Sequence, residues 1–339
     1  MDRAQDTPNE ERLEALPPPP PWRDFAGDLD AERGARFQPD PDEIEKVNAA
    51  LYLRRPLLIT GKPGTGKTSL VYAVARELGL GAVLRWSITS RSTLQDGQYR
   101  YDAVARLQDT EKGERPDIGP YLTLGPLGTA FCATEYQVQQ GERQGQTVYY
   151  PRVLLIDEID KSDIDLPNDL LHVFEEGYFE IPELVRVKAQ QPEVTLRTWG
   201  KPGGTAVIEQ GEVRCKAFPL VVMTSNGERD FPPPFLRRCL QLEMQPPQNT
   251  PENPKLTNIV QAHLGLGDNP DQRRQIEALI ATFLERREGK TAAGKQDLAT
   301  DQLLNAIYLA LNRVDPREGL TPQRKDSLLD ALWRPLSES

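Results

Sequence analysis

The fold is decided by one stretch of the chain, Gly61-Lys62-Pro63-Gly64-Thr65-Gly66-Lys67-Thr68. It fits the phosphate-binding pattern G-x-x-x-x-G-K-[ST], in which glycines let backbone amides face phosphate oxygens. Lys67 would place its charge on the β- and γ-phosphates, and the hydroxyl of Thr68 would reach a Mg²⁺ ion. With Ser69 next along the chain, we expect residues 61–69 to hold a nucleoside triphosphate together with Mg²⁺.

The residues on both sides of this loop supply the context that the pattern requires. An apolar run at 56–60 precedes it, and apolar residues recur at helical spacing from Leu70 to Leu78 after it. Further apolar runs at 83–87, 153–156 and 220–223 indicate strands buried on both faces. Strands that alternate with helices predict an α/β fold, here a P-loop NTPase core with a parallel sheet. Helical patterns near 254–264, 271–288, 299–313 and 322–333 predict a small α-helical lid domain behind it.

Two more strand ends carry polar residues. Asp157 and Glu158 follow the run at 153–156, where an open α/β sheet forms its ligand crevice. Asp157 can hold Mg²⁺ through water, and Glu158 can act as general base on the attacking water. Asn226 ends the strand after 220–223 and could orient that water, although an asparagine there is also a common turn former.

A pair of arginines, Arg237 and Arg238, follows eleven residues after Asn226. Beside an apolar segment, either side chain could reach the γ-phosphate of a neighbouring subunit as an arginine finger. Solvated surface arginines are the alternative.

At these positions the sequence resembles the AAA+ ATPases. The resemblance covers roughly residues 38–313 and rests on the phosphate loop, the acid pair, Thr224-Ser225-Asn226 and the arginine pair. Within AAA+ the chain looks like the MoxR branch, through three motifs: Arg55-Pro56-Leu57-Leu58-Ile59-Thr60-Gly61, Asp157-Glu158-Ile159-Asp160-Lys161 with Asn168-Asp169-Leu170-Leu171, and Leu236-Arg237-Arg238-Cys239.

The resemblance implies ATP as the nucleotide and a homo-oligomeric ring, usually hexameric. It also implies a partner protein with a von Willebrand factor A domain and a chaperone-like role in remodelling or assembling proteins, in some cases in bacterial defence. Arg229 would contact a neighbouring subunit. In similar proteins the lid helix that matches the segment near residue 300 commonly carries a second sensor residue. No arginine stands at the start of this helix here, and the nearest polar residues are Lys295, Gln296 and Thr300.

The pattern also predicts the domain organisation. Residues 1–36, with the run Pro17–Pro21, are expected to form a flexible, extended arm whose Trp22 and Phe25 could dock on the body or a neighbour. Residues 37–247 would form the ATPase domain, with inserts near 88–150 and 182–217, and 248–339 the lid. In the second insert, 194–198 and 206–209 predict a β-hairpin.

Composition narrows the function classes. The 339 residues are 38% hydrophobic, enough for a packed core, and the net charge of -10 disfavours a nucleic-acid partner. Cys132, Cys215 and Cys239 are too widely spaced for a zinc motif, so we expect reduced thiols. The sequence has neither a membrane-spanning run nor a signal peptide, and a cytoplasmic location is expected.

Three functions stay open at this point. The favoured one is a ring-forming ATPase that remodels a protein client. A nucleic-acid motor would need basic pore loops, and Arg197, Lys201 and Arg214 in the second insert keep it possible. A nucleotide-gated switch would turn over slowly, and the acid at Glu158 argues against it.

Overall fold

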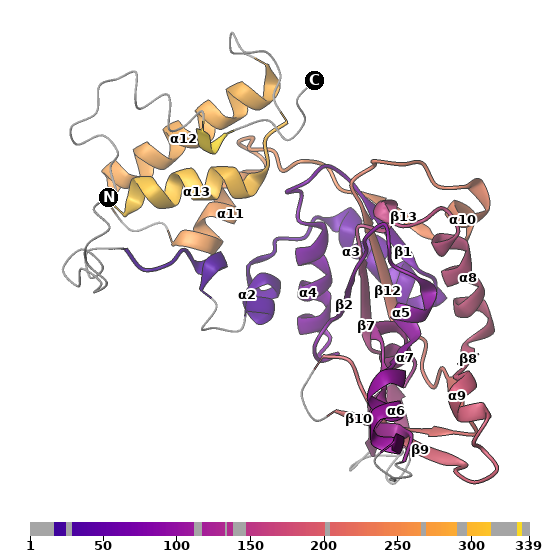
Figure 1. Cartoon of the computed structure of the whole chain (residues 1–339). Helices are drawn as coiled ribbons and strands as arrows, with labels where there is room; N and C mark the ends of the chain where they lie inside the picture. Colours follow the sequence, from indigo (N-terminus) through magenta and orange to yellow (C-terminus); the bar gives the residue numbers. More distant parts are fainter. Residues whose placement is uncertain are drawn as a thin grey trace, which may run out of the picture. The chain divides into compact units, whose positions relative to one another are not determined.

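The computed structural model describes residues 17–24, 29–111, 117–132, 134–137, 147–200, 204–265, 269–289, 297–312 and 331–333. Its contacts divide the chain into two units. One holds residues 39–62 and 66–245, and the other residues 1–38, 63–65 and 246–339. We call them the sheet unit and the helical unit (Figure 1).

The sheet unit is built on a five-stranded parallel sheet, as the sequence predicts. Its strand order is β13-β1-β12-β7-β2, with the bounds β1 Leu57–Thr60, β2 Leu84–Ser87, β7 Val153–Asp157, β12 Leu220–Ser225 and β13 Leu240–Glu243. β7 and β12 are buried along their whole length. β2 differs from the expected continuous burial, because it is an edge strand: Leu84 and Trp86 are buried while Arg85 and Ser87 are exposed.

Helices cover both faces of this sheet. In Figure 1, α4 (Lys67–Glu77) and α8 (Leu166–Glu176) lie on opposite sides of it. The helix α3 (Pro41–Leu53) begins at a capping box between Asp40 and Glu43. α8 ends at Gly177, whose φ of 68° is the left-handed conformation that glycine adopts without strain. α10 (Pro233–Arg238) is a short helix before β13.

The two inserted stretches form one second sheet, which the sequence did not indicate. Its order is β3-β4-β9-β10-β11-β8, with the bounds β3 Tyr99–Tyr101, β4 Leu122–Leu124, β8 Tyr178–Glu180, β9 Glu193–Arg197, β10 Thr205–Glu209 and β11 Glu212–Arg214. The antiparallel pairing of β9 with β10 confirms the predicted hairpin. β4 joins the inserts by pairing with β9 in parallel, Thr123 opposite Arg197.

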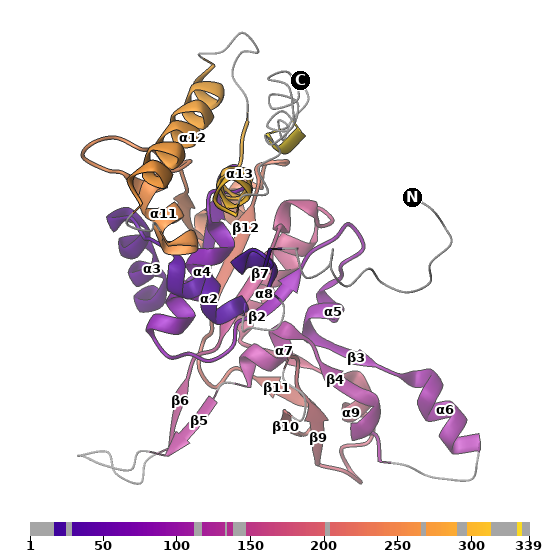
Figure 2. The ribbon, with the colours of Figure 1, turned by 90° about the vertical axis from the view of Figure 1, so that its left-hand side faces the viewer.

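Shorter elements complete this region. They are α5 (Leu94–Gln98), α6 (Ala103–Glu111), α7 (Pro126–Phe131), α9 (Pro182–Val185), and 3₁₀ turns at Gly119–Tyr121 and Ile159–Lys161. β5 (Thr134–Gln137) and β6 (Thr147–Tyr150) form a separate hairpin that extends from the unit in Figure 2.

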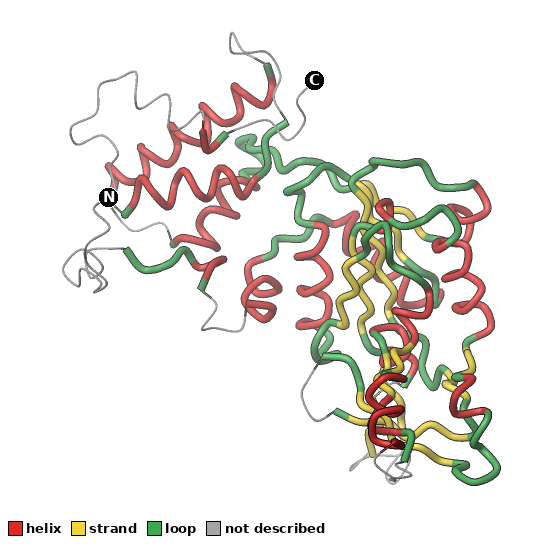
Figure 3. The backbone as a smooth tube through the Cα atoms, in the orientation of Figure 1, coloured by secondary structure: helices red, strands yellow, loops and turns green. Residues whose placement is uncertain are grey.

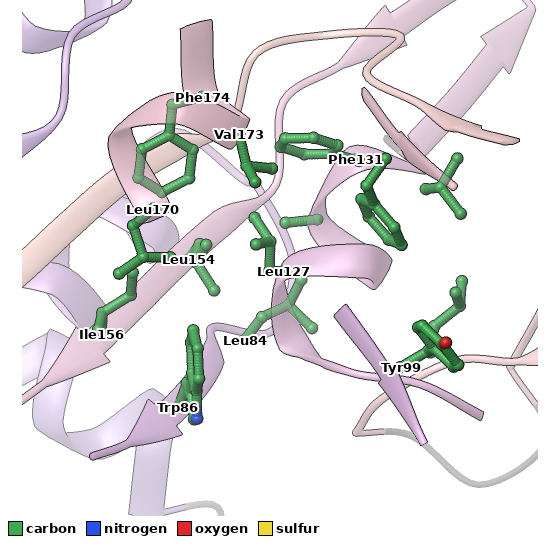
Figure 4. Packing of buried hydrophobic residues seen from close by; sticks show 14 of the residues in the cluster. Leu84, Trp86, Tyr99, Leu127, Phe131, Leu154, Ile156, Leu170, Val173 and Phe174 are labelled. Carbon is green, nitrogen blue, oxygen red and sulfur yellow. The ribbon is translucent and has the colours of Figure 1, made fainter. Parts of the chain in front are cut away.

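One hydrophobic core links the two sheets. Side chains from β2, β7, α7 and α8 pack together in it, among them Trp86, Ile156, Phe131 and Leu170 (Figure 4). Trp86 lies so close to Gly97 of α5 that a Cβ there would stand 2.4 Å from the indole. Glycine at this position therefore lets the insert approach β2.

The helical unit contains α11 (Lys255–Leu264), α12 (Pro270–Glu288) and α13 (Thr300–Leu311) (Figure 3). They confirm three of the four predicted lid helices, and the fourth, near 322–333, falls mostly outside the described residues. Phe283, Ile307 and Trp333 are buried in its core.

The N-terminal stretch belongs to this unit and differs from the expected extended arm. Residues Leu29–Arg36 form the helix α2, on which Asp30 pairs with Arg33 at 3.6 Å and Glu32 with Arg36 at 3.0 Å. Trp22, in the 3₁₀ turn Pro21–Arg23, packs edge-on against His263 and Tyr308. Its Nε1 donates to Asn305 Oδ1 at 3.1 Å. Phe25 lies outside the described residues.

Candidate nucleotide site

The polar strand ends meet at one edge of the five-stranded sheet. β1 pairs with β12, and β12 with β7, all in parallel. Ile59 lies opposite Thr224, and Met223 opposite Ile156, so the residues that follow these strands are neighbours. The phosphate loop, the acid pair and Asn226 therefore converge, as the sequence predicts for a parallel sheet.

The phosphate loop has the backbone that its glycines permit. Gly64 has φ 76° and Gly66 φ 96°, both in the left-handed region. α4 begins directly afterwards at Lys67, so the amides of its first turn and the positive end of its dipole are available to an anion.

Lys67 is a buried cation inside this loop. Its Nζ donates to the carbonyl oxygens of Gly61 at 2.6 Å and Lys62 at 3.0 Å. Burial lowers the pKa of Lys67, against the opposing attraction of Asp160, Asp157 and Glu158. The loop carbonyls hold the ammonium group where a phosphate would meet it.

Asp157 is the centre of a hydrogen-bond network. Its Oδ1 accepts from Thr224 Oγ1 at 2.6 Å and from Thr68 Oγ1 at 3.4 Å, while Oδ2 accepts from Arg85 Nη2 at 2.5 Å. The structure thus brings Thr68 and Asp157 together, as expected. Sequence reasoning missed Thr224 and Arg85, although the alternation of polar and apolar residues along β2 could have indicated Arg85.

The Thr68 hydroxyl and the Asp157 carboxylate are hard oxygen donors of the kind Mg²⁺ takes. Their separation of 3.4 Å allows both to face one ion or its water shell. These residues therefore fit the expected metal. Arg85 already neutralises the carboxylate and would compete with the ion for Oδ2.

Glu158 is held in a left-handed backbone conformation, φ 61° and ψ 50°, that is uncommon for a residue with a side chain. Its Oε1 lies 3.4 Å from Asn226 Nδ2, and its Oε2 accepts from Lys161 Nζ at 2.9 Å. Its backbone N–H donates to Thr224 Oγ1 at 2.9 Å. The expected base and the expected water-orienting amide are thus side by side.

Asp160 is a third residue whose role sequence reasoning missed. It is buried, and its Oδ2 accepts from the backbone N–H groups of Asn226 at 2.9 Å and Glu228 at 3.1 Å. Its Oδ1 is buried without a hydrogen-bond partner among the described residues. The motif Asp157-Glu158-Ile159-Asp160 contains it, but only the fold reveals that it anchors the loop after β12.

The arginine pair lies elsewhere, in the last turn of α10, and both side chains are exposed. Within the described ranges, neither has a hydrogen bond or ion pair to the strand-end residues. Arg238 Nε pairs with Glu175 Oε1 at 2.5 Å. Arg229 Nη2 reaches Ser162 Oγ at 3.4 Å and the carbonyl of Asp163 at 3.3 Å.

Of the sensor-2 candidates, Thr300 opens α13, whereas Lys295 and Gln296 lie outside the described residues. Among the described helices, none is long and apolar enough to cross a membrane. The described residues contain no group of three or more His, Cys, Asp and Glu side chains suited to a metal ion.

A phosphate loop, an acid pair and a polar strand end on adjoining parallel strands are the features of a P-loop NTPase fold. The family model of the ATPase family associated with various cellular activities (AAA) matches residues 57–166. That match runs from β1 into α8 and includes the phosphate loop and both acids. It identifies this segment as AAA ATPase sequence and supports ATP-dependent activity.

Solved structures with some similarity include NtrX from Brucella abortus in complex with ATP, at 13% identity and a TM-score of 0.35. The same protein in complex with ADP gives 12% and 0.31. The matches cover 84% and 88% of this chain but only 53% and 51% of the NtrX chains, so this chain spans about half their length. No curated protein sequence matches it.

Proposed function

We propose that this chain is a Mg²⁺-dependent ATP hydrolase whose site is formed by residues 61–69, Asp157, Glu158 and Asn226. The observation that carries the proposal is the 3.4 Å approach of Asn226 Nδ2 to Glu158 Oε1 at the strand ends beside the phosphate loop. Glu158 would take a proton from the attacking water while Asn226 orients that water. Mg²⁺, when bound through Thr68 and Asp157, would neutralise charge on the phosphates.

We further propose that the chain works as a MoxR-like homo-oligomeric ring, usually hexameric in that branch. Support comes from the exposed Arg237 and Arg238, which lie in a turn separate from the chain's own acids. An arginine finger supplied by a neighbouring subunit would complete each site.

We propose that the ring carries out chaperone-like remodelling or assembly of a protein partner, such as a von Willebrand factor A domain protein. Its proposed location is the cytoplasm, and its proposed setting is bacterial defence. The net charge of -10 supports a protein client over nucleic acid. The basic residues of the insert hairpin are also engaged within the chain: Arg197 donates to the carbonyl of Pro120 at 2.8 Å, and Arg214 pairs with Glu212 at 2.5 Å. Lys201 lies outside the described residues.

The direct test compares Glu158→Gln with wild type in phosphate release and in equilibrium binding of ATP. We expect the variant to bind ATP normally and to lose most of its turnover, on the order of 100-fold or more, because a general base contributes that much. Lys67→Ala should instead lose binding. Equal turnover in Glu158→Gln and wild type would reject the hydrolytic assignment.

A nucleotide-gated switch is the second candidate, and one observation favours it. Both acids are restrained by cations in the structure, Asp157 by Arg85 and Glu158 by Lys161. A slow switch would be accelerated when Glu158 is released, so Lys161→Ala should raise turnover. In a remodelling ATPase, client protein would raise turnover and Lys161→Ala would not.

A further inference from the structure

Arg55 lies between α3 and β1, and its guanidinium group reaches the end of α10. Nε donates to the carbonyl oxygen of Arg238 at 3.2 Å, and Nη2 donates to that of Arg237 and lies 3.5 Å from that of Cys239. The last carbonyls of a helix lack partners inside the helix and carry its negative dipole end. A planar cation with several donors is well suited to hold them.

This contact adds a polar clamp to a short helix that is otherwise held by the packing of Phe235 and by the ion pair of Arg238 with Glu175. The helix has six residues, its N-cap Pro232 gives no side-chain cap, and Phe235 is its buried residue. Arg55 also stands directly before Pro56, whose carbonyl oxygen accepts from the N–H of Leu240 at 2.8 Å. The start of β1, the strand that leads to the phosphate loop, is thereby tied to the arginine pair.

The two arginines of the pair differ in their side-chain contacts. Arg238 is joined to Glu175 of the same chain at 2.5 Å. Arg237 is exposed and has neither a hydrogen bond nor an ion pair from its side chain within the described part of the chain. Of the two, Arg237 is the guanidinium available to an incoming phosphate.

We infer that Arg55 is a positioning residue, which clamps the carbonyl end of α10 so that Arg237 is presented to the nucleotide site of a second copy of this chain. This inference rests on the proposed ring-forming ATPase. It assigns the finger to Arg237 and gives Arg238 a role within its own chain. It also predicts that substitution of Arg55 impairs ATP hydrolysis in the site of the neighbouring subunit.

The test compares Arg55→Ala and Arg55→Lys with the matched control Arg54→Ala. Arg54 is the adjacent exposed arginine, and it donates to the carbonyl of Leu51 in its own helix. Arg55→Ala should lower kcat on the order of 100-fold, as misplacement of a catalytic group does, while the Kd for ATP changes less than about twofold. Arg55→Lys should recover part of kcat, because a single ammonium nitrogen can replace some but not all of the contacts that two guanidinium nitrogens make with the three carbonyls. Arg54→Ala should behave as wild type.

Mixing subunits shows in which site the defect lies. Glu158→Gln subunits cannot hydrolyse ATP but carry an intact α10, whereas Arg55→Ala subunits have an intact acid pair. In a random equal mixture, about a quarter of the head-to-tail interfaces combine an intact acid with an intact finger, so activity should return to about a quarter of the wild-type value. Arg237→Ala mixed in the same way should give the same recovery.

No recovery in the Arg55→Ala mixture, while Arg237→Ala recovers, would overturn the role of Arg55 and leave the ring proposal standing. Wild-type kcat in Arg237→Ala would instead overturn the assignment of the finger to Arg237. If Arg55→Ala does not fold by circular dichroism, Arg55→Lys takes its place in the mixtures under the same criteria.

Discussion

Asp160 offers a measurable test of how the loop after β12 is held. Its buried carboxylate accepts hydrogen bonds from the N–H groups of Asn226 and Glu228 at 2.9 and 3.1 Å. Hydrogen bonds to a charged acceptor contribute about 1.5–3 kcal/mol each, and release of the buried carboxylate returns part of that. We therefore expect Asp160→Ala to cost about 3 kcal/mol, and Asp160→Asn, which keeps an acceptor oxygen, about 1 kcal/mol.

Hydrogen exchange measures this cost where it arises. A loss of about 3 kcal/mol should speed exchange of the amides of Asn226 and Glu228 on the order of 100-fold in Asp160→Ala. Because the loop carries the amide next to Glu158, kcat should fall at least about tenfold while ATP affinity stays near wild type. The control is Asp165→Ala, an exposed acid without a side-chain cap hydrogen bond, which should change stability by less than about 0.5 kcal/mol.

Unchanged exchange of these two amides in Asp160→Ala would refute the anchoring role. Faster exchange with an unchanged kcat would show that the loop is anchored by Asp160 but that its position does not limit hydrolysis. In that case Asn226 would lose its assignment as the residue that orients water.

Three further predictions concern other parts of the chain. Trp22→Ala should destabilise the helical unit by about 2–3 kcal/mol, since it removes two edge-on aromatic contacts and the hydrogen bond to Asn305. Chemical denaturation measures this loss, and Trp22→Phe should lose less stability than Trp22→Ala. Unchanged stability in Trp22→Ala would mean that the arm is not docked in solution. Burial raises the pKa of the Cys132 and Cys215 thiols to about 11, so both thiols stay protonated below that pH. Their alkylation by iodoacetamide in the folded protein should therefore rise about tenfold per pH unit between pH 7 and 10. A plateau of the alkylation rate near pH 9 would contradict this buried environment. Arg85→Met should lower the half-saturating Mg²⁺ concentration for ATP hydrolysis about fivefold. This factor is the equivalent of about 1 kcal/mol, the contribution expected of the partly exposed ion pair between Arg85 and Asp157. A higher Mg²⁺ requirement in Arg85→Met would show that Arg85 assists the ion instead of competing with it.

The core fold could be predicted because its signals are local. The glycine loop, the buried runs at β7 and β12, and the polar residue after each strand lie within short windows of sequence. Parallel pairing then brings the strand ends together without further information. That is why the sequence predicts that Thr68, Asp157, Glu158 and Asn226 lie near one another, and the structure brings Thr68 to Asp157 and Asn226 to Glu158.

Apart from its β9–β10 hairpin, the second sheet could not be predicted, because the pairing that joins the two inserts is not local. β4 meets β9 through Thr123 and Arg197, which lie far apart in the sequence and come from two different inserts. The strands are short, and β3, β4, β8 and β11 have only three residues each, too few for a clear period-two pattern. These strands are far apart in the sequence, and only the folded structure shows that the two inserts belong to one sheet.

The same limit applies to Asp160 and Arg85. Each is an ordinary charged residue in the sequence, and its role depends on a partner that another strand supplies. The N-terminal arm shows the limit in another form, because a proline run predicts no regular structure of its own but says nothing about where the following tryptophan packs.

The arginine pair shows most clearly what the structure adds to a sequence motif. Arg237 and Arg238 are adjacent and chemically identical, so no sequence argument can separate them. On a helix, adjacent residues point about 100° apart. This rotation directs the Arg238 side chain to Glu175, whereas the Arg237 side chain has no ion pair within the described residues. The backbone that sets the rotation is in turn held by Arg55. The proposed finger therefore depends on three residues: Arg237, which would reach the neighbour, Arg238, which pairs within the chain, and Arg55, which holds the end of the helix.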